Sequence, residues 1–412
     1  MILGHTIALD PTAKQANALT RAVGVARSTY NWGLAEWRRQ YEAGLKPNAN
    51  KLKKEFNAIK RERFPWVMES PRDANSAAFT DLNAAFSNFF KSLKGDRKGE
   101  RVGYPQFRKK GKKDAFYVAN DKFSFSDDGA RVRLPVIGSV RIHETLRLKG
   151  KIMGGRVRLR AGRWYLSVQV ETEARVPTAH LHPIIGADLG LKTAVFPSRG
   201  SPALAPKPLK NMLARLRRAN RTLHRRKKGS HNRRKAVKRV GCIHGRIADV
   251  RKDFMHKITT RLCRENQTVV IEDLNVRGMM RNHRLARALS DVGFGMFRIL
   301  LTYKAIIYGC ELVVADRWFP SSKRCHACGY VKDTLDLSER VYRCEACGLV
   351  EDRDKNASLN LEQYPRLEGN WNRKVRTPGD EQASTHLAGQ VSKLVQKGRH
   401  DRASAKSQEL IS

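Results

Sequence analysis

The chain has 412 residues, and its 81 Lys and Arg residues outnumber its 39 Asp and Glu residues, which leaves a net charge of +42. A hydrophobic fraction of 41% can build folded cores, so the charge does not indicate a wholly disordered chain. The length favours two or more domains, and the charge favours an anionic partner, with nucleic acid ahead of a membrane surface. No apolar run reaches the roughly 18 residues of a membrane span, and the first residues lack the layout of a signal peptide.

The first part of the chain predicts one strand followed by helices. Residues 2–9 are apolar enough for a strand, and Thr12 and Gln15 then form a capping box that starts a helix. A second helical pattern covers residues 73–93, so a helical module is expected over 12–95. The apolar stripe of the first helix recurs at steps of three and four residues and comprises Leu19, Val23, Ala26, Tyr30, Leu34, Trp37 and Tyr41. We interpret Trp32, Trp37 and Tyr41 as core residues rather than base-stacking platforms.

Beyond a basic, glycine-containing linker at 96–113, the pattern changes to that of short strands. Alternating apolar and polar residues, interrupted by turn signals such as Asp127-Asp-Gly, predict a small β-barrel of the OB type over 114–182. The N-terminal strand, residues 1–11, is expected to join this barrel. The helical module is then an insertion between the first two strands.

The next region combines a buried strand with a strongly basic segment. Residues 184–187 form an apolar strand that ends at Asp188, and residues 193–196 are its expected hairpin partner. Residues 206–264 contain 21 Lys and Arg residues but only two acids. Because Leu and Ile recur at helical spacing on both sides of a Gly-Ser turn, we predict a helical hairpin that is apolar inside and basic outside.

The last third of the chain returns to alternating strands and helices. A strand at 268–273 carries Glu272 near its end, and a helix at 294–308 and a strand at 312–315 follow. A short helix is expected to begin at Asp354. Beyond residue 365 the apolar content falls and the periodicity is lost, which predicts a flexible tail.

Four of the seven cysteines form two Cys-x-x-Cys pairs, each followed by glycine, and these are Cys325, Cys328, Cys344 and Cys347. This spacing places four thiolates at tetrahedral corners and predicts one structural Zn²⁺ with no open position for catalysis. We interpret His326, inside the first pair, as a bystander. The other three are expected to be core residues and are Cys242, Cys263 and Cys310. Cysteine used for metal binding indicates a reducing compartment.

Three acidic residues lie at the ends of predicted strands or at the start of a predicted helix, where a buried charge is unfavourable without a partner. Asp188 and Glu272 end apolar strands, and Asp354 begins a helix. In an RNase H-like α/β fold such positions converge, and a carboxylate cluster of this kind suits Mg²⁺. The sequence leaves competitors for a metal-binding role, and these are Asp273, Asp316 and Asp352.

The order of these motifs resembles the TnpB family, the RNA-guided nucleases encoded by bacterial insertion-sequence transposons and apparent ancestors of the compact type V CRISPR nucleases. The resemblance covers roughly residues 1–364. Its segments in chain order are Ile185-Gly-Ala-Asp-Leu-Gly, the basic hairpin, Ile271-Glu-Asp-Leu, Phe319-Pro-Ser-Ser-Lys-Arg-Cys-His-Ala-Cys-Gly and Asp352-Arg-Asp-Lys-Asn-Ala.

The resemblance implies a multidomain α/β protein. It implies an RNase H-like RuvC nuclease domain with an inserted zinc ribbon, and an N-terminal β-barrel, the wedge domain, with an inserted helical recognition module. The expected boundaries are 1–11 and 114–182 for the barrel, 12–95 for the module, 96–113 for the linker, 183–320 and 351–364 for the RuvC core with its hairpin at 206–264, 321–350 for the ribbon and 365–412 for the tail.

By resemblance, the RuvC triad falls on Asp188, Glu272 and Asp354, because the family pattern Asp-x-Asn-Ala puts the acid two residues before Asn356. The implied cofactors are two Mg²⁺ ions, or Mn²⁺ in their place, one structural Zn²⁺ and a guide RNA from the transposon end. The implied substrate is double-stranded DNA, cut on both strands beside a short adjacent motif. No His-rich second nuclease motif is present, so one triad must cut both strands. A monomer is expected, cytoplasmic and associated with the bacterial nucleoid rather than a membrane.

In this interpretation base pairing supplies specificity, and the basic hairpin contacts nucleic-acid backbone. The candidate contacts on the hairpin are Arg215, Arg217, Arg218, Arg221, Arg225, Arg226, Lys227, Lys228, Arg233 and Arg234. By position in the chain, we expect the adjacent motif to be read by Arg72, Ser76 and Asn120.

Three other functions stay open on the sequence. One is a CRISPR-associated effector of the same fold, which genome neighbourhood distinguishes. Another is a guided DNA-binding repressor with impaired nuclease, which should lack at least one acid of the triad. The third is a zinc-ribbon nucleic-acid-binding regulator without a guide RNA.

Overall fold

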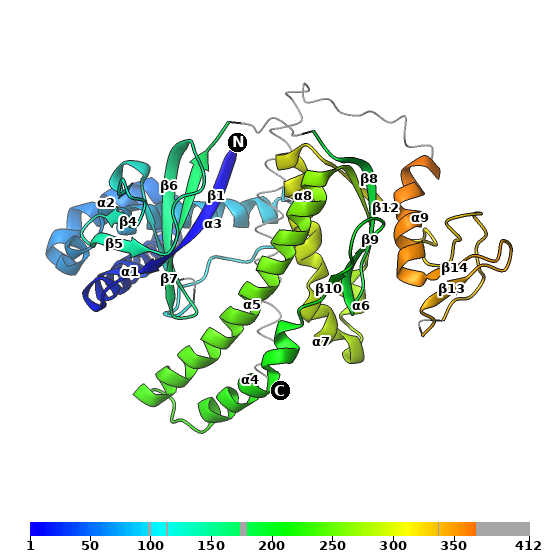
Figure 1. The fold of residues 1–412 in the computed structure, drawn as a ribbon. Helices are drawn as coiled ribbons and strands as arrows, with labels where there is room; N and C mark the ends of the chain where they lie inside the picture. The colour runs from blue at the N-terminus through cyan, green and yellow to red at the C-terminus, as the bar shows by residue number, and fades with distance from the viewer. Residues whose placement is uncertain (98–99, 113, 174–178, 337, 368–412) are drawn as a thin grey trace. The chain divides into compact units, whose positions relative to one another are not determined.

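The computed structural model describes residues 1–97, 100–112, 114–173, 179–336 and 338–367. The chain divides into two compact units, Met1–Ala174 and Arg175–Ser412 (Figure 1). The expected tail at 365–412 lies outside the described residues except for its first three. Those three continue the last helix, so the predicted tail boundary was wrong there. In the described part of the chain, no helix is both long and apolar enough to cross a membrane.

The first unit contains a seven-stranded sheet in the order β2-β6-β7-β1-β5-β4-β3. Its strands are β1 (Ile2–Asp10), β2 (Ala115–Val118), β3 (Ser124–Phe125), β4 (Arg131–Leu134), β5 (Gly138–Ile142), β6 (Lys151–Arg160) and β7 (Arg163–Glu171). The N-terminal strand pairs antiparallel with both β5 and β7, so it joins this sheet as predicted. In the described residues the strand order runs between two edges, β2 and β3, and closure into a barrel stays a prediction.

Helices lie between β1 and β2 in the chain. They are α1 (Ala13–Glu42), α2 (Ala49–Arg63), the 3-10 helix η1 (Pro65–Glu69) and α3 (Arg72–Leu93), and a short 3-10 helix, η2 (Asn120–Lys122), follows β2. The predicted capping box of Thr12 and Gln15 is confirmed. Helices α1 and α3 pack closely because Gly33 of α1 faces Leu82 and Phe79 of α3. A Cβ atom at this glycine would lie 3.0–3.2 Å from their side chains.

The predicted stripe of α1 is buried as far as Trp37, whose ring stacks on Phe86 at a centroid distance of 3.8 Å. Tyr41, in the last turn, is 70% exposed, so its placement in the core was wrong. Helical periodicity identifies the buried face of a helix, but it does not indicate how far along the helix the packing partner reaches.

The second unit contains a five-stranded sheet in the order β10-β9-β8-β11-β12. Its strands are β8 (His182–Asp188), β9 (Thr193–Pro197), β10 (Ala203–Leu204), β11 (Asn266–Glu272) and β12 (Glu311–Ala315). The neighbours β8, β11 and β12 are parallel, and β9 is the antiparallel hairpin partner of β8 that the sequence predicted.

The two faces of this sheet are covered by different helices. Helices α5 (His231–Glu265) and α8 (Phe294–Tyr308) cover one face, and α9 (Arg353–Leu367) covers the other (Figure 1). Side chains alternate accordingly: Ile185 and Ile271 belong to the α5 and α8 core, while Ile184 and Val270 pack with Leu361 of α9.

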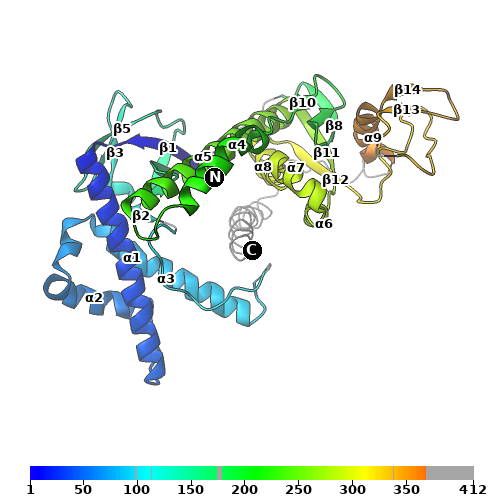
Figure 2. The ribbon, with the colours of Figure 1, turned by 90° about the horizontal axis from the view of Figure 1, so that it is seen from below.

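The basic segment forms the predicted helical hairpin of α4 (Pro208–His224) and α5, which lie side by side (Figure 2). Its inner contacts come from a small apolar cluster that includes Leu216 and Ile243. Helices α6 (Val276–Met279) and α7 (His283–Val292), which the sequence analysis did not identify, precede α8. From α7, buried Asp291 accepts hydrogen bonds from the amides of Leu209 (2.9 Å) and Lys210 (3.0 Å), and so caps the first turn of α4.

A small cysteine-rich segment precedes α9. Its hairpin consists of β13 (Val341–Arg343) and β14 (Val350–Asp352), and β14 leads directly into α9. Outside this segment Cys263 and Cys310 are buried as predicted. Cys242 is exposed, so its placement in the core was wrong. It lies in α5 outside the small apolar cluster between the two hairpin helices.

Candidate functional site

Two acidic residues lie side by side at the carboxyl ends of neighbouring parallel strands. The register of β8 and β11 pairs Gly186 with Val270 and Ala187 with Ile271, and the next step along both strands brings Asp188 beside Glu272. Both acids follow, at intervals of two, residues that pack against α9, so their side chains lie on the α9 face of the sheet. The topology thus brings together two carboxyl groups that are 84 residues apart in the sequence.

The third acid comes from α9, and Gly186 allows it to approach. A Cβ atom on Gly186 would lie 2.0 Å from the carbonyl oxygen of Ser358 and 2.5 Å from the amide nitrogen of Glu362. The backbone of α9 therefore rests directly on β8. Asp354 lies one helical turn before Ser358, and Asp188 lies two residues after Gly186 on the same face of the strand, so this contact aligns the two acids.

The electrostatics of the cluster are those of like charges held together in a poorly hydrated place. Burial, and then the neighbouring carboxylates of Glu272 and Asp354, raise the pKa of Asp188 to about 8. Burial also raises the pKa of Glu272, although a hydrogen bond from the Ser321 hydroxyl opposes this shift. Such a cluster of hard oxygen donors fits divalent cations, because a cation would neutralise the repulsion that the three acids exert on one another.

The spacing of the acids distinguishes them from a tight single-ion cage. Among the residues that the structure describes, only the four paired cysteines place their ligand atoms all within 4.8 Å of one another. The three carboxyl groups therefore form a wider cluster.

The three competing acids are engaged in structural interactions. Asp352 accepts hydrogen bonds from the amides of Asp354 (2.9 Å) and Lys355 (3.0 Å) and so caps α9. Asp273 forms ion pairs with Arg298 and Arg317, which lower its pKa. These contacts favour Asp354 over Asp352 as the third acid of the cluster.

Asp316 is likewise occupied within its own loop. Its carboxylate accepts a hydrogen bond of 2.8 Å from the amide of Trp318, directly after β12. Its own amide donates to the hydroxyl of Tyr364 at 3.1 Å, which ties the loop to α9.

The four cysteines form a site whose dimensions fit zinc. The Sγ atoms of Cys325 and Cys347 are 3.7 Å apart, and those of Cys328 and Cys344 are 3.6 Å apart. A tetrahedron with Zn–S bonds of about 2.3 Å has S–S edges of about 3.8 Å. The glycine that follows each pair adopts a positive φ, which closes each knuckle as the sequence predicted.

The first knuckle is docked on α9 by polar side chains from one face of that helix. Buried Asn356 and Asn360 both donate to the carbonyl of Arg324, at 2.7 and 2.6 Å. Gln363 donates to the carbonyl of His326 at 3.0 Å, and the amide of His326 donates to Asn356 at 3.1 Å. His326 lies outside the metal-binding group, as the sequence predicted, and it joins the knuckle to α9 through its backbone and through its ring, whose Nδ1 is 3.0 Å from the amide oxygen of Asn356.

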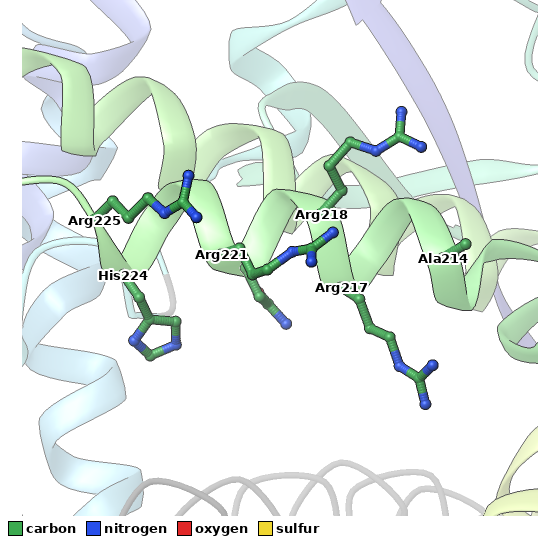
Figure 3. A pocket seen from close by; sticks show the side chains of 7 residues that line it. Ala214, Arg217, Arg218, Arg221, His224 and Arg225 are labelled. Atoms are coloured by element: carbon green, nitrogen blue, oxygen red, sulfur yellow. The ribbon is translucent and has the colours of Figure 1, made fainter.

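The basic hairpin displays its cations on the surface. Figure 3 shows the guanidinium groups of α4 extending away from the helix. They border a surface depression of about 790 Å³. The depression is lined by Ala214, Arg217, Arg218, Asn220, Arg221, His224 and Arg225. No acidic residue occurs in α4, so this surface is suited to a polyanion.

Nine of the ten predicted hairpin contacts are exposed, and these are Arg215, Arg217, Arg218, Arg221, Arg225, Arg226, Lys227, Lys228 and Arg234. Arg233 differs because it is partly buried in the turn of the hairpin. Its guanidinium donates to the carbonyls of Leu223 (2.9 Å) and Arg226 (3.0 Å), where it caps the end of α4.

In the first unit, the three predicted readers of an adjacent motif occur in one region. Arg72 is exposed at the start of α3, and Ser76 lies one turn further along the same helix. The carboxylate of Asp73 accepts a hydrogen bond of 2.8 Å from the amide of Ala119, which brings the exposed Asn120 to this end of α3.

The sequence analysis missed the residues that position the acids. Ser321 is 3% exposed and contacts Glu272 from a loop 49 residues later in the chain. Gly186, Ser321 and Asn356 belong to the quoted motifs and Asn360 follows the last of them, but the roles of these residues depend on contacts between elements. The Asn-x-x-x-Asn spacing in a helix was the one signal available, since it places two amides on one face.

Three family models match the chain. One described as "Probable transposase" matches residues 166–283, and one described as "Cas12f1-like, TNB domain" matches residues 294–361. A third, described as "Helix-turn-helix domain", matches residues 1–46. In the structure this last segment consists of one strand and one 30-residue helix.

Related proteins match most of the chain. A protein of Streptomyces pristinaespiralis named "Putative RNA-guided DNA endonuclease" is 38% identical, over 85% of this chain and 86% of its own. A Mycobacterium tuberculosis protein of the same description is 32% identical, over 86% of this chain and 85% of its own. Among solved structures, a Cas12f1–sgRNA–target DNA complex aligns with 85% of this chain and 82% of its own, at 16% identity and a TM-score of 0.48.

The close approach of α9 to β8 makes Gly186→Ala an informative variant. The added methyl would collide with the backbone of α9, so we expect a loss of about 1–3 kcal/mol of stability and weaker protection of the α9 amides. Hydrogen exchange measured by mass spectrometry would report this helix separately from β11.

Gly241→Ala in α5 is the matched control, because nothing lies within 4 Å of a Cβ atom at that position. It should be neutral or stabilising by up to about 1 kcal/mol. Unchanged protection of α9 in Gly186→Ala would contradict the direct backbone contact.

Proposed function

Because the chain belongs to the TnpB family of transposon-encoded RNA-guided DNA endonucleases, we propose that it cuts both strands of a target DNA duplex at a single RuvC-type centre. The centre consists of Asp188, Glu272 and Asp354. The observation that carries this proposal is the buried carboxyl group of Asp188, held against two other carboxylates at the ends of parallel strands.

The three acids would hold two Mg²⁺ ions, with Mn²⁺ as an alternative. Such ions, when bound, supply an activated water and stabilise the leaving 3′ oxygen. The chain's own residues prepare this site: Ser321 orients Glu272 through its hydroxyl, and Asp352 caps the helix that presents Asp354. The wide cluster leaves the phosphate of the substrate room to enter.

The zinc site is proposed to be structural and to act through α9. Four thiolates complete a tetrahedral shell, so the metal has no position for a substrate. The knuckle that it folds is bonded to Asn356 and Asn360, and the same helix presents Asp354. Zinc would therefore orient the helix of the third acid and control the entry of single strands.

Guide RNA and target DNA are the proposed partners of the basic surfaces. The exposed cations of α4 and of the hairpin turn would contact phosphates, while base pairing selects the target. The first unit would act as wedge domain and recognition module, with Arg72, Ser76 and Asn120 reading the adjacent motif. The presence of all three acids argues against a repressor with an impaired nuclease.

Asp188→Ala should abolish cutting while the protein still copurifies with its RNA. Removing one of three acids takes away several kcal/mol of transition-state stabilisation, which is about a 1,000-fold slower reaction or more. Cleavage of a matched plasmid and sequencing of the bound RNA measure the two properties. Asp253→Ala removes an exposed acid of α5 and is the control; cutting by Asp188→Ala would remove the triad assignment.

Zinc-free protein should bind RNA but fail to cut DNA in excess Mg²⁺. The double variant Cys344→Ser, Cys347→Ser removes two of the four thiolates and so avoids a chelator that would also remove Mg²⁺. Metal analysis verifies the loss of zinc, and cleavage is then measured. Cys242→Ser, outside the cluster, should cut normally. Full activity in verified zinc-free protein would refute coupling through α9.

Neutralising the hairpin surface should weaken RNA binding and make it less sensitive to salt. Changing Arg217, Arg218, Arg225 and Arg226 to Gln should lower the slope of log K against log salt by about 0.7 for each phosphate that the protein no longer neutralises. Arg233→Gln is the control, because its guanidinium already bonds to backbone carbonyls. An unaltered slope in the fourfold variant would count against the hairpin as a phosphate-binding surface.

A further inference from the structure

One aromatic side chain in the loop that follows β12 lies open to solvent. Trp318 is 85% exposed, the largest value among the large hydrophobic side chains that the structure describes. Exposing an indole to water is unfavourable, because burial would remove its large apolar surface from water. The proposed reaction does not yet assign this residue a role.

The loop that carries Trp318 is fixed on both sides of it. Before it, Asp316 accepts from the amide of Trp318, and the guanidinium of Arg317 is 2.7 Å from the carboxylate of Asp273. After it, Phe319 packs edge-on against Tyr364 of α9 at a ring-centroid distance of 4.8 Å. The exposure of the indole is therefore held by the structure and does not result from a loose loop.

Both ends of this loop lie at Glu272. Ala315, the last residue of β12, pairs with Glu272 in the sheet, and the Ser321 hydroxyl donates to the Glu272 carboxylate. Trp318 is three residues from each of these contacts. Because an extended chain spans at most about 3.5 Å per residue, its backbone lies within roughly 10 Å of residues that touch Glu272.

Two arginines lie in the neighbourhood of Trp318. Arg317 precedes it in the chain and shares Asp273 with Arg298, and together with Asp316 these four side chains carry no net charge. Both guanidinium groups remain about half exposed. An open indole beside exposed arginines is the combination with which proteins hold single-stranded nucleic acid, by stacking on bases and attracting phosphates.

We propose that Trp318 is a stacking platform for an unpaired base of the DNA strand that enters the acidic centre. This inference rests on the proposed function and assigns a residue that positions the strand to be cut. Stacking tolerates any base, so it suits an enzyme whose sequence choice is made elsewhere by pairing. In a duplex the face of each base is already covered by its neighbours, so a duplex gains nothing from the indole.

The test measures binding of a single-stranded DNA oligonucleotide that contains 2-aminopurine, whose fluorescence is quenched by stacking. The full-length protein with its guide RNA is used, in Mg²⁺ and with Asp188→Asn to prevent cleavage. Adding Trp318→Ala should raise the Kd about 5- to 100-fold and abolish the protein-dependent quenching. Trp318→Phe, which keeps a flat ring, should stay within about threefold of the parent and retain most of the quenching.

Tyr41→Ala, which removes a 70% exposed aromatic ring of the first unit, is the matched control and should change neither quantity. A duplex of the same sequence should bind independently of Trp318. The inference is overturned if Trp318→Ala binds single strands like its parent, if Trp318→Phe binds as weakly as Trp318→Ala, or if duplex binding falls equally. The last outcome would indicate a general surface contact.

Cleavage by the protein with its native Asp188, measured in parallel, separates this inference from the proposed function. Normal cleavage without Trp318-dependent quenching rejects the stacking platform alone. Quenching that depends on Trp318, in a protein that cuts no DNA, supports the platform and rejects the nuclease assignment.

Discussion

The close approach of α9 to β8 at Gly186 is the constraint on which the candidate site depends. Two acids can be aligned by the register of parallel strands alone, but the third must come from another layer of the fold. Because the backbone of α9 touches β8 at a glycine, the distance between helix and strand is fixed and the helix can hardly shift along the strand. The position of Asp354 therefore depends on the lack of a side chain at residue 186. It depends also on Leu361 and Tyr364, which α9 buries against the same face of the sheet.

This arrangement gathers negative charge inside a protein that is otherwise strongly positive. Burial and the neighbouring carboxylates raise the pKa of Asp188 to about 8. Keeping this group ionised therefore lowers the stability of the folded protein, and the rest of the fold has to compensate for that loss. The neighbouring Asp273 is treated differently, since two arginines neutralise it within the protein. The adjacent Glu272, at the same strand end, instead accepts a hydrogen bond from Ser321 and raises the pKa of Asp188.

The cysteine-rich segment and the basic hairpin are both attached to the sheet domain by polar contacts of buried side chains. Asn356 and Asn360 bond to main-chain carbonyls of the first knuckle, and Asp291 caps α4 and pairs with Arg251. Buried polar contacts of this kind are costly to break, because each leaves an unsatisfied group behind. They hold two segments with small apolar cores in defined orientations, which a few hydrophobic contacts alone would not specify.

Much of the architecture was determined by local pattern in the sequence. The capping box, the strand ending at Asp188, the hairpin and α8 follow from periodicity and turn chemistry, and the four cysteines follow from spacing. Tyr41, Cys242 and the end of α9 were misjudged, because each depends on how far a packing partner extends. How the competing acids are neutralised, why residue 186 lacks a side chain, and why Trp318 is exposed were decided only by the tertiary structure. These properties arise from contacts between residues that are tens of positions apart, and no local period records such contacts.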